Sequence, residues 1–226
     1  LHSPLDLNIL EILENEYHYF SNIPQGVGLG SSAALSASIY DLSTNSSHLS
    51  LTDKKDDLAQ IESFFHGKSS GFDPLVSLEG SALIQSSLGI SRLNTLSTSP
   101  LDIYLLYTGI QRDAHLLIEA FQKRNTDLSF KEKMNTLAIL SSDNIESFSK
   151  GNSNLTDLLA ISKLQYDCLD FLIIPEIKKI WENSFKKADY AIKLCGAGGG
   201  GCYLLFTEKE KLPEDIQCCQ LEKLDL

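Results

Sequence analysis

Three glycines at alternate positions, 26, 28 and 30, constrain the fold of this chain more than any other feature. They lie in residues 24–34, Pro-Gln-Gly-Val-Gly-Leu-Gly-Ser-Ser-Ala-Ala. Glycine permits positive φ and lets a ligand approach backbone N–H groups closely. The start of a helix leaves its first N–H groups unpaired and carries a partial positive charge. The stretch therefore predicts a loop that leads into a helix and binds an anion, most simply a phosphate chain.

Two common nucleotide-binding loops are excluded by the residues that follow these glycines. A Walker A loop requires a Lys, and none follows here. The G-x-G-x-x-G frame of dinucleotide-binding proteins fails because Ala33 stands at the third glycine position. Taken alone, the stretch is also compatible with a turn that only begins a helix.

The composition is that of an ordinary globular protein with an acidic surface. The 226 residues are 42% hydrophobic and 22% charged, enough for one large or two small domains. A net charge of −11 argues against nucleic acid and against anionic membranes as partners. No apolar run approaches the length of a membrane span, and the first residues lack the basic start and apolar core of a secretory signal. We expect a cytoplasmic protein.

The cysteines agree with a reducing compartment. Their number is odd and no spacing fits a metal site, so free thiols are the simplest interpretation. The five are Cys168, Cys195, Cys202, Cys218 and Cys219.

Periodicity and turn residues predict a mixed α+β fold without internal repeats. A Ser- and Pro-containing stretch at residues 97–100 separates domain 1–98 from domain 99–226. Helices are predicted over residues 5–13, 32–42, 52–65, 113–123, 130–149, 155–173, 175–187 and 213–224. Strands are predicted over residues 16–23, 81–85, 90–93, 101–107, 189–194 and 202–206, with a turn at 66–72.

Two further strings change the interpretation of the glycine loop. Residues 66–73 read His-Gly-Lys-Ser-Ser-Gly-Phe-Asp, and residues 193–202 read Lys-Leu-Cys-Gly-Ala-Gly-Gly-Gly-Gly-Cys. In order, the three segments resemble the second motif, the substrate-site motif and the third motif of the GHMP kinase superfamily. Within it they most resemble the mevalonate kinases in three features: the string Gly-Val-Gly-Leu-Gly-Ser-Ser-Ala-Ala, the string His-Gly-x-x-Ser-Gly-x-Asp, and Glu62 eleven residues before Asp73. The resemblance spans residues 21–202.

The resemblance implies a two-domain fold: an N-terminal domain like ribosomal S5 domain 2 and a ferredoxin-like C-terminal domain. The first motif of the superfamily, Pro-Gly-Lys-x-x-Leu-x-Gly-Glu-His, does not occur in residues 1–20. We therefore expect the N-terminal domain to be partial and the catalytic Lys of that motif to lie outside this chain. Lys68 is not taken as its replacement, because the superfamily commonly has a small residue there.

The resemblance further implies ATP and Mg²⁺ as cofactors. Magnesium prefers hard oxygen ligands, and the resemblance assigns it to Ser32 and Glu62. A helix cap is an additional role for Ser32, and a solvated helix face is the alternative for Glu62. The residues expected to contact the nucleotide are Ser21, Gly26, Val27, Gly28, Leu29, Gly30, Ser31 and Ser32.

Asp73 is the implied general base, which would accept the proton of the substrate alcohol. Its alternative role is to cap the turn before Pro74. Arg112 lies where the mevalonate kinases have an Asn-Thr-x-x-Pro-Arg-x-Thr string, but Ala114 replaces the final Thr here. A surface ion pair is an equal alternative role for Arg112. The candidate substrate residues are His66, Ser70, Gly71, Arg112, Gly198 and Gly199.

The glycines at 196 and 198–201 would form the turn of the third motif. A tight hairpin needs fewer glycines, so five of them indicate close approach to a ligand or to another backbone segment.

The predicted function is ATP-dependent phosphorylation of the primary alcohol of mevalonate to 5-phosphomevalonate, in isoprenoid biosynthesis. Two alternatives stay open: another kinase of the superfamily that acts on phosphomevalonate or a sugar, and a truncated non-catalytic relative that binds a ligand. The expected partner is the small-molecule substrate, with no nucleic acid and no membrane. The oligomeric state stays open, with a homodimer among the options.

Overall fold

The computed structural model describes residues 1–226 except 94–98, 113, 217–218 and 225–226, and excludes the side chains of residues 66, 114 and 115. The chain divides into two compact units. Unit 1 comprises Leu1–Pro24 and Gly30–Thr95, and unit 2 comprises Gln25–Leu29 and Leu96–Leu226. The short glycine loop 25–29 is thus part of unit 2, although the helix that follows it belongs to unit 1.

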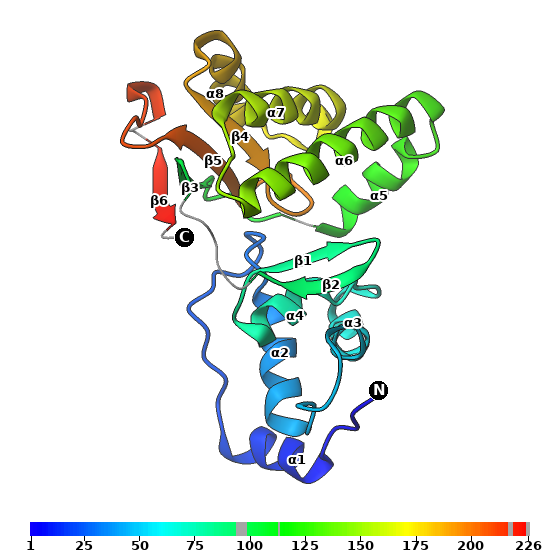
Figure 1. The fold of residues 1–226 in the computed structure, drawn as a ribbon. Coiled ribbons are helices and arrows are strands. Elements are labelled where there is room, and N and C mark those ends of the chain that lie inside the picture. Colours follow the sequence, from blue (N-terminus) through cyan, green and yellow to red (C-terminus); the bar gives the residue numbers. More distant parts are fainter. Residues whose placement is uncertain (94–98, 113, 217–218, 225–226) are drawn as a thin grey trace. The chain divides into compact units, whose positions relative to one another are not determined.

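Unit 1 is helical with one small hairpin (Figure 1). Its core contains the fully buried side chains of Tyr40, Leu58 and Leu75. The hairpin strands pair antiparallel, with Leu83 opposite Arg92. Its elements are α1 (Leu7–Glu16), α2 (Ser31–Ser43), α3 (Leu51–His66), α4 (Phe72–Glu79), β1 (Leu83–Ser86) and β2 (Gly89–Arg92).

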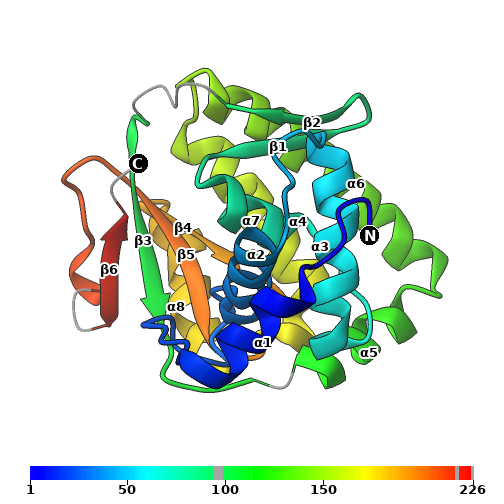
Figure 2. The ribbon, with the colours of Figure 1, turned by 90° about the horizontal axis from the view of Figure 1, so that it is seen from below.

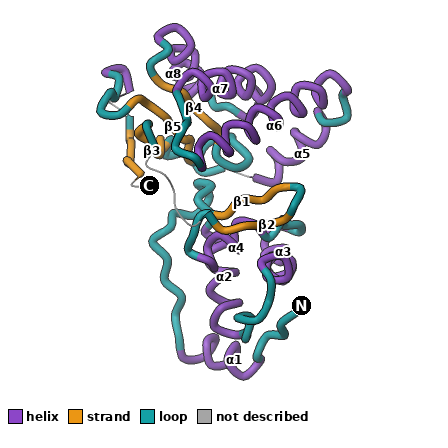
Figure 3. The backbone as a smooth tube through the Cα atoms, viewed as in Figure 1, coloured by secondary structure: helices purple, strands orange, loops and turns teal. Residues whose placement is uncertain are grey.

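The strand predicted over residues 16–23 is wrong. Helix α1 continues to Glu16, and the segment after it is drawn as loop in Figure 3. Tyr17, Tyr19 and Phe20 are exposed by 63, 54 and 88%. Aromatic content favours a strand only where a neighbouring strand completes the ladder of hydrogen bonds, and no described strand pairs with this segment.

Helix α4 begins where the sequence predicts only a turn. Pro74 lies in its first turn, where backbone N–H groups have no intrahelical acceptor in any case. The Asp-Pro pair therefore starts a helix here and does not interrupt one.

Unit 2 is built on a four-stranded antiparallel sheet with strand order β4-β5-β3-β6, the order of a ferredoxin-like fold (Figure 2). Its helices are α5 (Ala114–Arg124), α6 (Leu128–Ser149), α7 (Leu155–Leu169) and α8 (Pro175–Lys187), with 3₁₀ turns η1 (Asp170–Leu172) and η2 (Glu214–Ile216). Its strands are β3 (Leu101–Tyr107), β4 (Tyr190–Leu194), β5 (Cys202–Glu208) and β6 (Gln220–Leu224).

The helix predicted over residues 213–224 is also wrong. The chain forms η2 and then β6, which pairs with the edge of β3, placing Leu221 opposite Leu106 and Leu224 opposite Ile103. The hydrogen bonds of this edge pairing outweigh a local helical preference, because β3 would otherwise expose an open edge.

The core of unit 2 joins α7 and α8 to the sheet. Trp181 is fully buried, and its Nε1 donates a hydrogen bond to Ser162 Oγ at 2.7 Å. Ser162 Oγ also accepts from the N–H of Ile192 at 3.3 Å. The ring of Trp181 packs edge-on against Tyr203, with centroids 6.0 Å apart. In the described part of the chain, no helix combines the length and the apolar character needed to cross a bilayer.

Candidate functional site

The glycine loop has the backbone geometry that its sequence predicts. Gly26 and Gly28 have φ of 75° and 82°, values that favour glycine. The loop carbonyls are used inside unit 2: Gly26 accepts from the N–H of Arg112 at 3.2 Å, and Val27 accepts from the N–H of Cys202 at 3.0 Å. Among the described residues, no atom accepts a hydrogen bond from the backbone N–H groups of residues 26–31. Such free donors can bind an anion.

In unit 1, no side chain caps the first turn of α2. Its N-cap is Gly30, with φ of 73° and no side-chain hydrogen bond. Ser32 is therefore not the cap; its Oγ donates instead to Oε1 of Glu62 in α3, 3.2 Å away. The uncapped turn and the hydroxyl thus lie at the same helix end.

Glu62 is buried, with 7% exposure, and does not lie on a solvated helix face. Its second carboxylate oxygen, Oε2, accepts a hydrogen bond from the hydroxyl of Ser69. A buried carboxylate with two hydroxyl neighbours is a set of hard oxygen donors, which suits Mg²⁺. Among the described residues there is no cluster of three His, Cys, Asp or Glu side chains that could hold a metal, so a magnesium ion here would need phosphate or water oxygens as well.

Ser69 is the residue that the sequence analysis missed. Its Oγ also accepts from the N–H of Gly71 at 2.9 Å, and its own N–H donates to Ser63 Oγ at 3.1 Å. Ser69 lies beyond the end of α3 at His66, so no helical spacing in the sequence pointed to its contact with Glu62.

Asp73 lies in the first turn of α4, which is capped at Gly71 and not by the Asp73 side chain. Desolvation raises the pKa of the Asp73 carboxyl, and the negative charge of Glu62 raises it further. Asp73 is nevertheless exposed to solvent, which limits the effect of desolvation. A carboxylate with a raised pKa is a better proton acceptor than an ordinary one.

Gly71 and Ser70 have local structural roles. A Cβ at Gly71 would lie 2.1 Å from the carbonyl oxygen of Lys55 and 2.9 Å from Ala59, so this glycine lets α4 begin against α3. Ser70 Oγ accepts from the N–H of Phe72 at 3.3 Å. The side chain of His66 lies outside the described residues.

The glycines of the 196–201 turn are approached by protein atoms on the side where a Cβ would lie. At Gly198 the nearest atom would be the Leu172 carbonyl oxygen at 2.6 Å, and at Gly199 it would be Leu117 Cδ1 at 2.5 Å. At Gly201 it would be the carbonyl oxygen of Val27 at 2.2 Å. The glycine run thus allows other parts of unit 2 to pack closely, as the count of glycines indicates.

Arg112 and Ser21 make local contacts. The Arg112 side chain is half-buried, and its Nη1 donates to the carbonyl oxygens of Cys195 at 2.8 Å and Gly198 at 3.2 Å. Arg112 forms no ion pair with any of the described residues. Its alternative role, a surface ion pair, is therefore not seen in the described part of the chain. Ser21 Oγ accepts from the N–H of Ile23 at 3.1 Å, which stabilises a turn.

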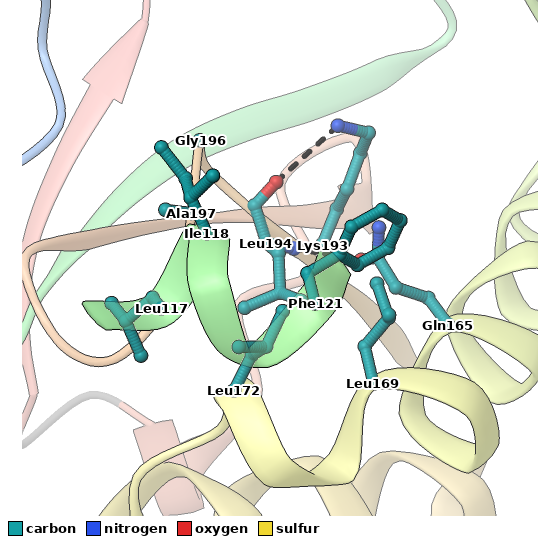
Figure 4. Close-up of a pocket in the computed structure, with 10 residues that line it drawn as sticks. All are labelled: Leu117, Ile118, Phe121, Gln165, Leu169, Leu172, Lys193, Leu194, Gly196 and Ala197. Atoms are coloured by element: carbon teal, nitrogen blue, oxygen red, sulfur yellow. Dashed lines mark hydrogen bonds between the residues drawn. The ribbon is translucent and has the colours of Figure 1, made fainter. Parts of the chain in front are cut away.

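A pocket of about 280 Å³ opens beside the glycine turn of unit 2 (Figure 4). Apolar side chains of α5, α7, η1 and β4 form most of its wall. Lys193 also lines it, with Nζ 3.3 Å from the carbonyl oxygen of Leu194. The lining residues are Leu117, Ile118, Phe121, Gln165, Leu169, Leu172, Lys193, Leu194, Gly196 and Ala197.

Sequence comparisons match two family models to this chain. The model described as "GHMP kinases N terminal domain" matches residues 7–81, and "GHMP kinases C terminal" matches residues 139–219. A mevalonate kinase of Pyrococcus horikoshii is 30% identical over 194 residues, which cover 80% of this chain and 56% of that protein. A mevalonate kinase of Arabidopsis thaliana is 26% identical over 233 residues, which cover 87% of this chain and 58% of that protein. The chain thus spans less than two thirds of the length of these curated relatives.

Solved structures resemble the chain across most of its length. The mevalonate kinase of Methanococcus jannaschii has a TM-score of 0.66 at 16% identity, covering 95% of this chain and 72% of that one. The phosphomevalonate kinase of Streptococcus pneumoniae, solved with phosphomevalonate and AMPPNP, has a TM-score of 0.54 at 15% identity, covering 76% and 56%. At these identities the likeness establishes a shared fold.

Proposed function

We propose that this chain, which belongs to the GHMP kinase superfamily, carries the nucleotide and phosphoryl-transfer residues of an ATP-dependent mevalonate kinase. The observation that supports this most directly is the Ser32–Glu62 pair at the uncapped start of α2. A hydroxyl and a buried carboxylate at a helix end with free N–H donors are suited to a metal-bound phosphate chain.

The proposed reaction transfers the γ-phosphoryl group of ATP to the primary alcohol of mevalonate. The alcohol oxygen forms a bond to the γ-phosphorus, the bond to the β–γ bridging oxygen breaks, and ADP leaves. The proton of the alcohol moves to the carboxylate of Asp73. The raised pKa of Asp73 suits this role, because a base with a pKa closer to neutrality has a stronger affinity for the proton.

Backbone donors of residues 26–31 would bind the phosphate oxygens, since no acceptor among the described residues uses these N–H groups. Ser32 and Glu62 would hold Mg²⁺, which neutralises charge on the transferred phosphoryl group when it is bound. The burial of Glu62 keeps its carboxylate in place between two hydroxyl groups. We expect the enzyme in the cytoplasm, in agreement with the free thiols of Cys168, Cys195 and Cys202.

The test is ADP release by the purified product of the full gene, so that a first-motif Lys is present if the gene encodes one. It is measured with Mg²⁺–ATP and one acceptor at a time: mevalonate, phosphomevalonate, galactose or homoserine. We expect release that depends on mevalonate, with one phosphate added to the product by mass spectrometry. Activity with phosphomevalonate or galactose alone would overturn the substrate assignment and leave the kinase assignment standing. Nucleotide binding without transfer to any acceptor would favour a non-catalytic binding protein.

A further inference from the structure

Arg112 lies between two backbone segments of unit 2 that are far apart in sequence. Its N–H donates to the Gly26 carbonyl at 3.2 Å, so its backbone is joined to the glycine loop 25–29. Its Nη1 donates to the carbonyls of Cys195 at 2.8 Å and Gly198 at 3.2 Å, so its side chain is joined to the glycine turn 195–201. One residue therefore connects both glycine segments.

The glycines that face the guanidinium leave room for it. A Cβ at Gly28 would lie 2.3 Å from Nη2 and 2.8 Å from Cζ of Arg112. A Cβ at Gly196 would lie 2.6 Å from the same Nη2. All three distances are far below van der Waals contact, so any side chain at either position would displace the guanidinium.

The two glycine segments also contact each other directly beside Arg112. The N–H of Cys202 donates to the Val27 carbonyl at 3.0 Å, and a Cβ at Gly201 would lie 2.2 Å from that carbonyl oxygen. A guanidinium presents its donors in a rigid planar fork, which can hold two carbonyls at a fixed spacing. No carboxylate among the described residues competes for it.

We propose that Arg112 is a positioning residue that clamps the glycine loop 25–29 to the glycine turn 195–201 and so fixes the loop conformation that receives the nucleotide phosphates. Gly28 and Gly196 have positive φ of 82° and 57°, and the guanidinium also occupies the space that their side chains would take. The clamp itself is a property of unit 2, and only its effect on the nucleotide rests on the proposed function.

The first test measures the clamp without any ligand. Hydrogen–deuterium exchange of the ligand-free protein is compared between wild type and Arg112→Ala, in peptides covering residues 25–30 and 195–202. We expect exchange at the Cys202 amide to accelerate by about tenfold or more, because its acceptor Val27 is released. The exposed Lys123→Ala change on α5 serves as the control for loss of a cation. Unchanged exchange in Arg112→Ala would overturn the clamp.

The second test uses the contact with Gly28. Gly28→Ala is made in wild type and in Arg112→Ala, and the unfolding equilibrium is measured by urea titration. We expect Gly28→Ala to be costlier when the guanidinium is present, with a coupling of about tenfold in the unfolding constant. Gly30→Ala is the matched control, since Gly30 has a similar φ of 73° but its Cβ would meet only Ala33 at 3.6 Å. Equal costs of Gly28→Ala in both backgrounds would contradict the proposal.

The third test separates a clamp from direct contact with the acceptor. Arg112→Lys keeps the charge but loses the fork, and we expect it to weaken binding of a fluorescent ATP analogue by about tenfold while the acceptor KM stays unchanged. A raised acceptor KM with unchanged nucleotide affinity would overturn the clamp in favour of acceptor contact. If wild type binds no nucleotide but exchange still responds to Arg112→Ala, the clamp stands and the proposed function fails.

Discussion

The hydroxyl of Ser32 and the carboxylate of Glu62 lie 3.2 Å apart in unit 1, joining the start of α2 to the last turns of α3. We predict that Ser32→Ala and Glu62→Gln each raise the Mg²⁺ concentration needed for half-maximal ADP release by about tenfold or more. High Mg²⁺ should restore part of the activity, because each variant weakens Mg²⁺ binding but keeps the proposed base, Asp73. Ser38→Ala is the control, since its hydroxyl bonds only the Ala34 carbonyl within α2. An unchanged requirement for Mg²⁺ in both variants would remove these residues from the metal site.

Replacing the proposed base should act on turnover and spare nucleotide binding. We expect Asp73→Asn to lower kcat by about 10²- to 10⁴-fold, the usual contribution of a general base. The Kd for an ATP analogue should stay within about twofold. In wild type, kcat/KM should rise with pH through the pKa of Asp73, which lies above the ordinary value of 3.8. Normal turnover by the variant would sink the assignment of Asp73.

The same substitution makes a separate prediction about stability. Because the folded-state pKa of Asp73 is raised, the folded state binds the proton more tightly than the unfolded state. The ionised carboxylate therefore destabilises the fold at neutral pH, and this effect disappears below the ordinary pKa of 3.8. Asp73→Asn should raise the urea midpoint at neutral pH and leave it unchanged in acid. A lower midpoint at neutral pH would show that the carboxylate makes a stabilising contact.

Glu79, at the end of α4, should make unit 1 sensitive to acid. Burial alone would raise its pKa, but hydrogen bonds from Arg92 and from Lys54 at 3.0 Å outweigh burial and lower it. Its contribution to stability is therefore present above the ordinary value of 4.5 and is lost as pH falls through its lowered pKa.

We expect Glu79→Gln to destabilise the protein by about 3 kcal/mol at neutral pH, because it leaves two cations next to a neutral buried group. The loss should shrink as the solution is acidified. Glu146→Gln, which breaks the exposed pair with Lys150, is the control and should cost much less stability, because water screens that pair. Equal losses in urea titrations of the two variants would contradict the role given to burial.

Two glycines with nearly the same φ should differ sharply in their tolerance of a side chain. Gly67 and Gly71 have φ of 73° and 72°, but a Cβ at Gly67 would meet nothing within 4 Å, whereas one at Gly71 would meet the Lys55 carbonyl at 2.1 Å. Gly71→Ala should therefore cost about 1–3 kcal/mol more than Gly67→Ala in thermal or urea unfolding. Similar costs would mean that α3 and α4 can separate without penalty.

Local sequence patterns correctly predicted helices whose formation depends on residues close together in the chain. Helix α8 begins at Pro175 as the sequence indicates, and α3 covers the predicted range 52–65 within one residue. The two failures, at residues 16–23 and 213–224, concern segments whose conformation depends on a partner strand. Strand β6 exists because β3 offers it an edge, and the aromatic segment after α1 has no such neighbour among the described strands.

In the candidate site, too, motif spacing indicated some contacts, whereas others arise only from the three-dimensional fold. The motif spacing pointed to Ser32 and Glu62, which the structure brings into hydrogen-bond contact. It did not point to Ser69, because the contribution of that residue depends on where the chain turns after α3. The contacts of Arg112 with the carbonyls of residues 83 and 86 positions away along the chain arise only in three dimensions.

Trp181 is the single tryptophan of the chain and is enclosed in the core of unit 2. Its indole N–H donates to Ser162 of α7 and its ring packs against Tyr203 of β5, so its environment changes when the core of unit 2 opens. Tryptophan emission should therefore report the unfolding of unit 2 alone, whereas far-ultraviolet circular dichroism reports the helices of both units. Recording the two signals in one titration would reveal whether the units melt together, and the natural sequence supplies this probe without any label.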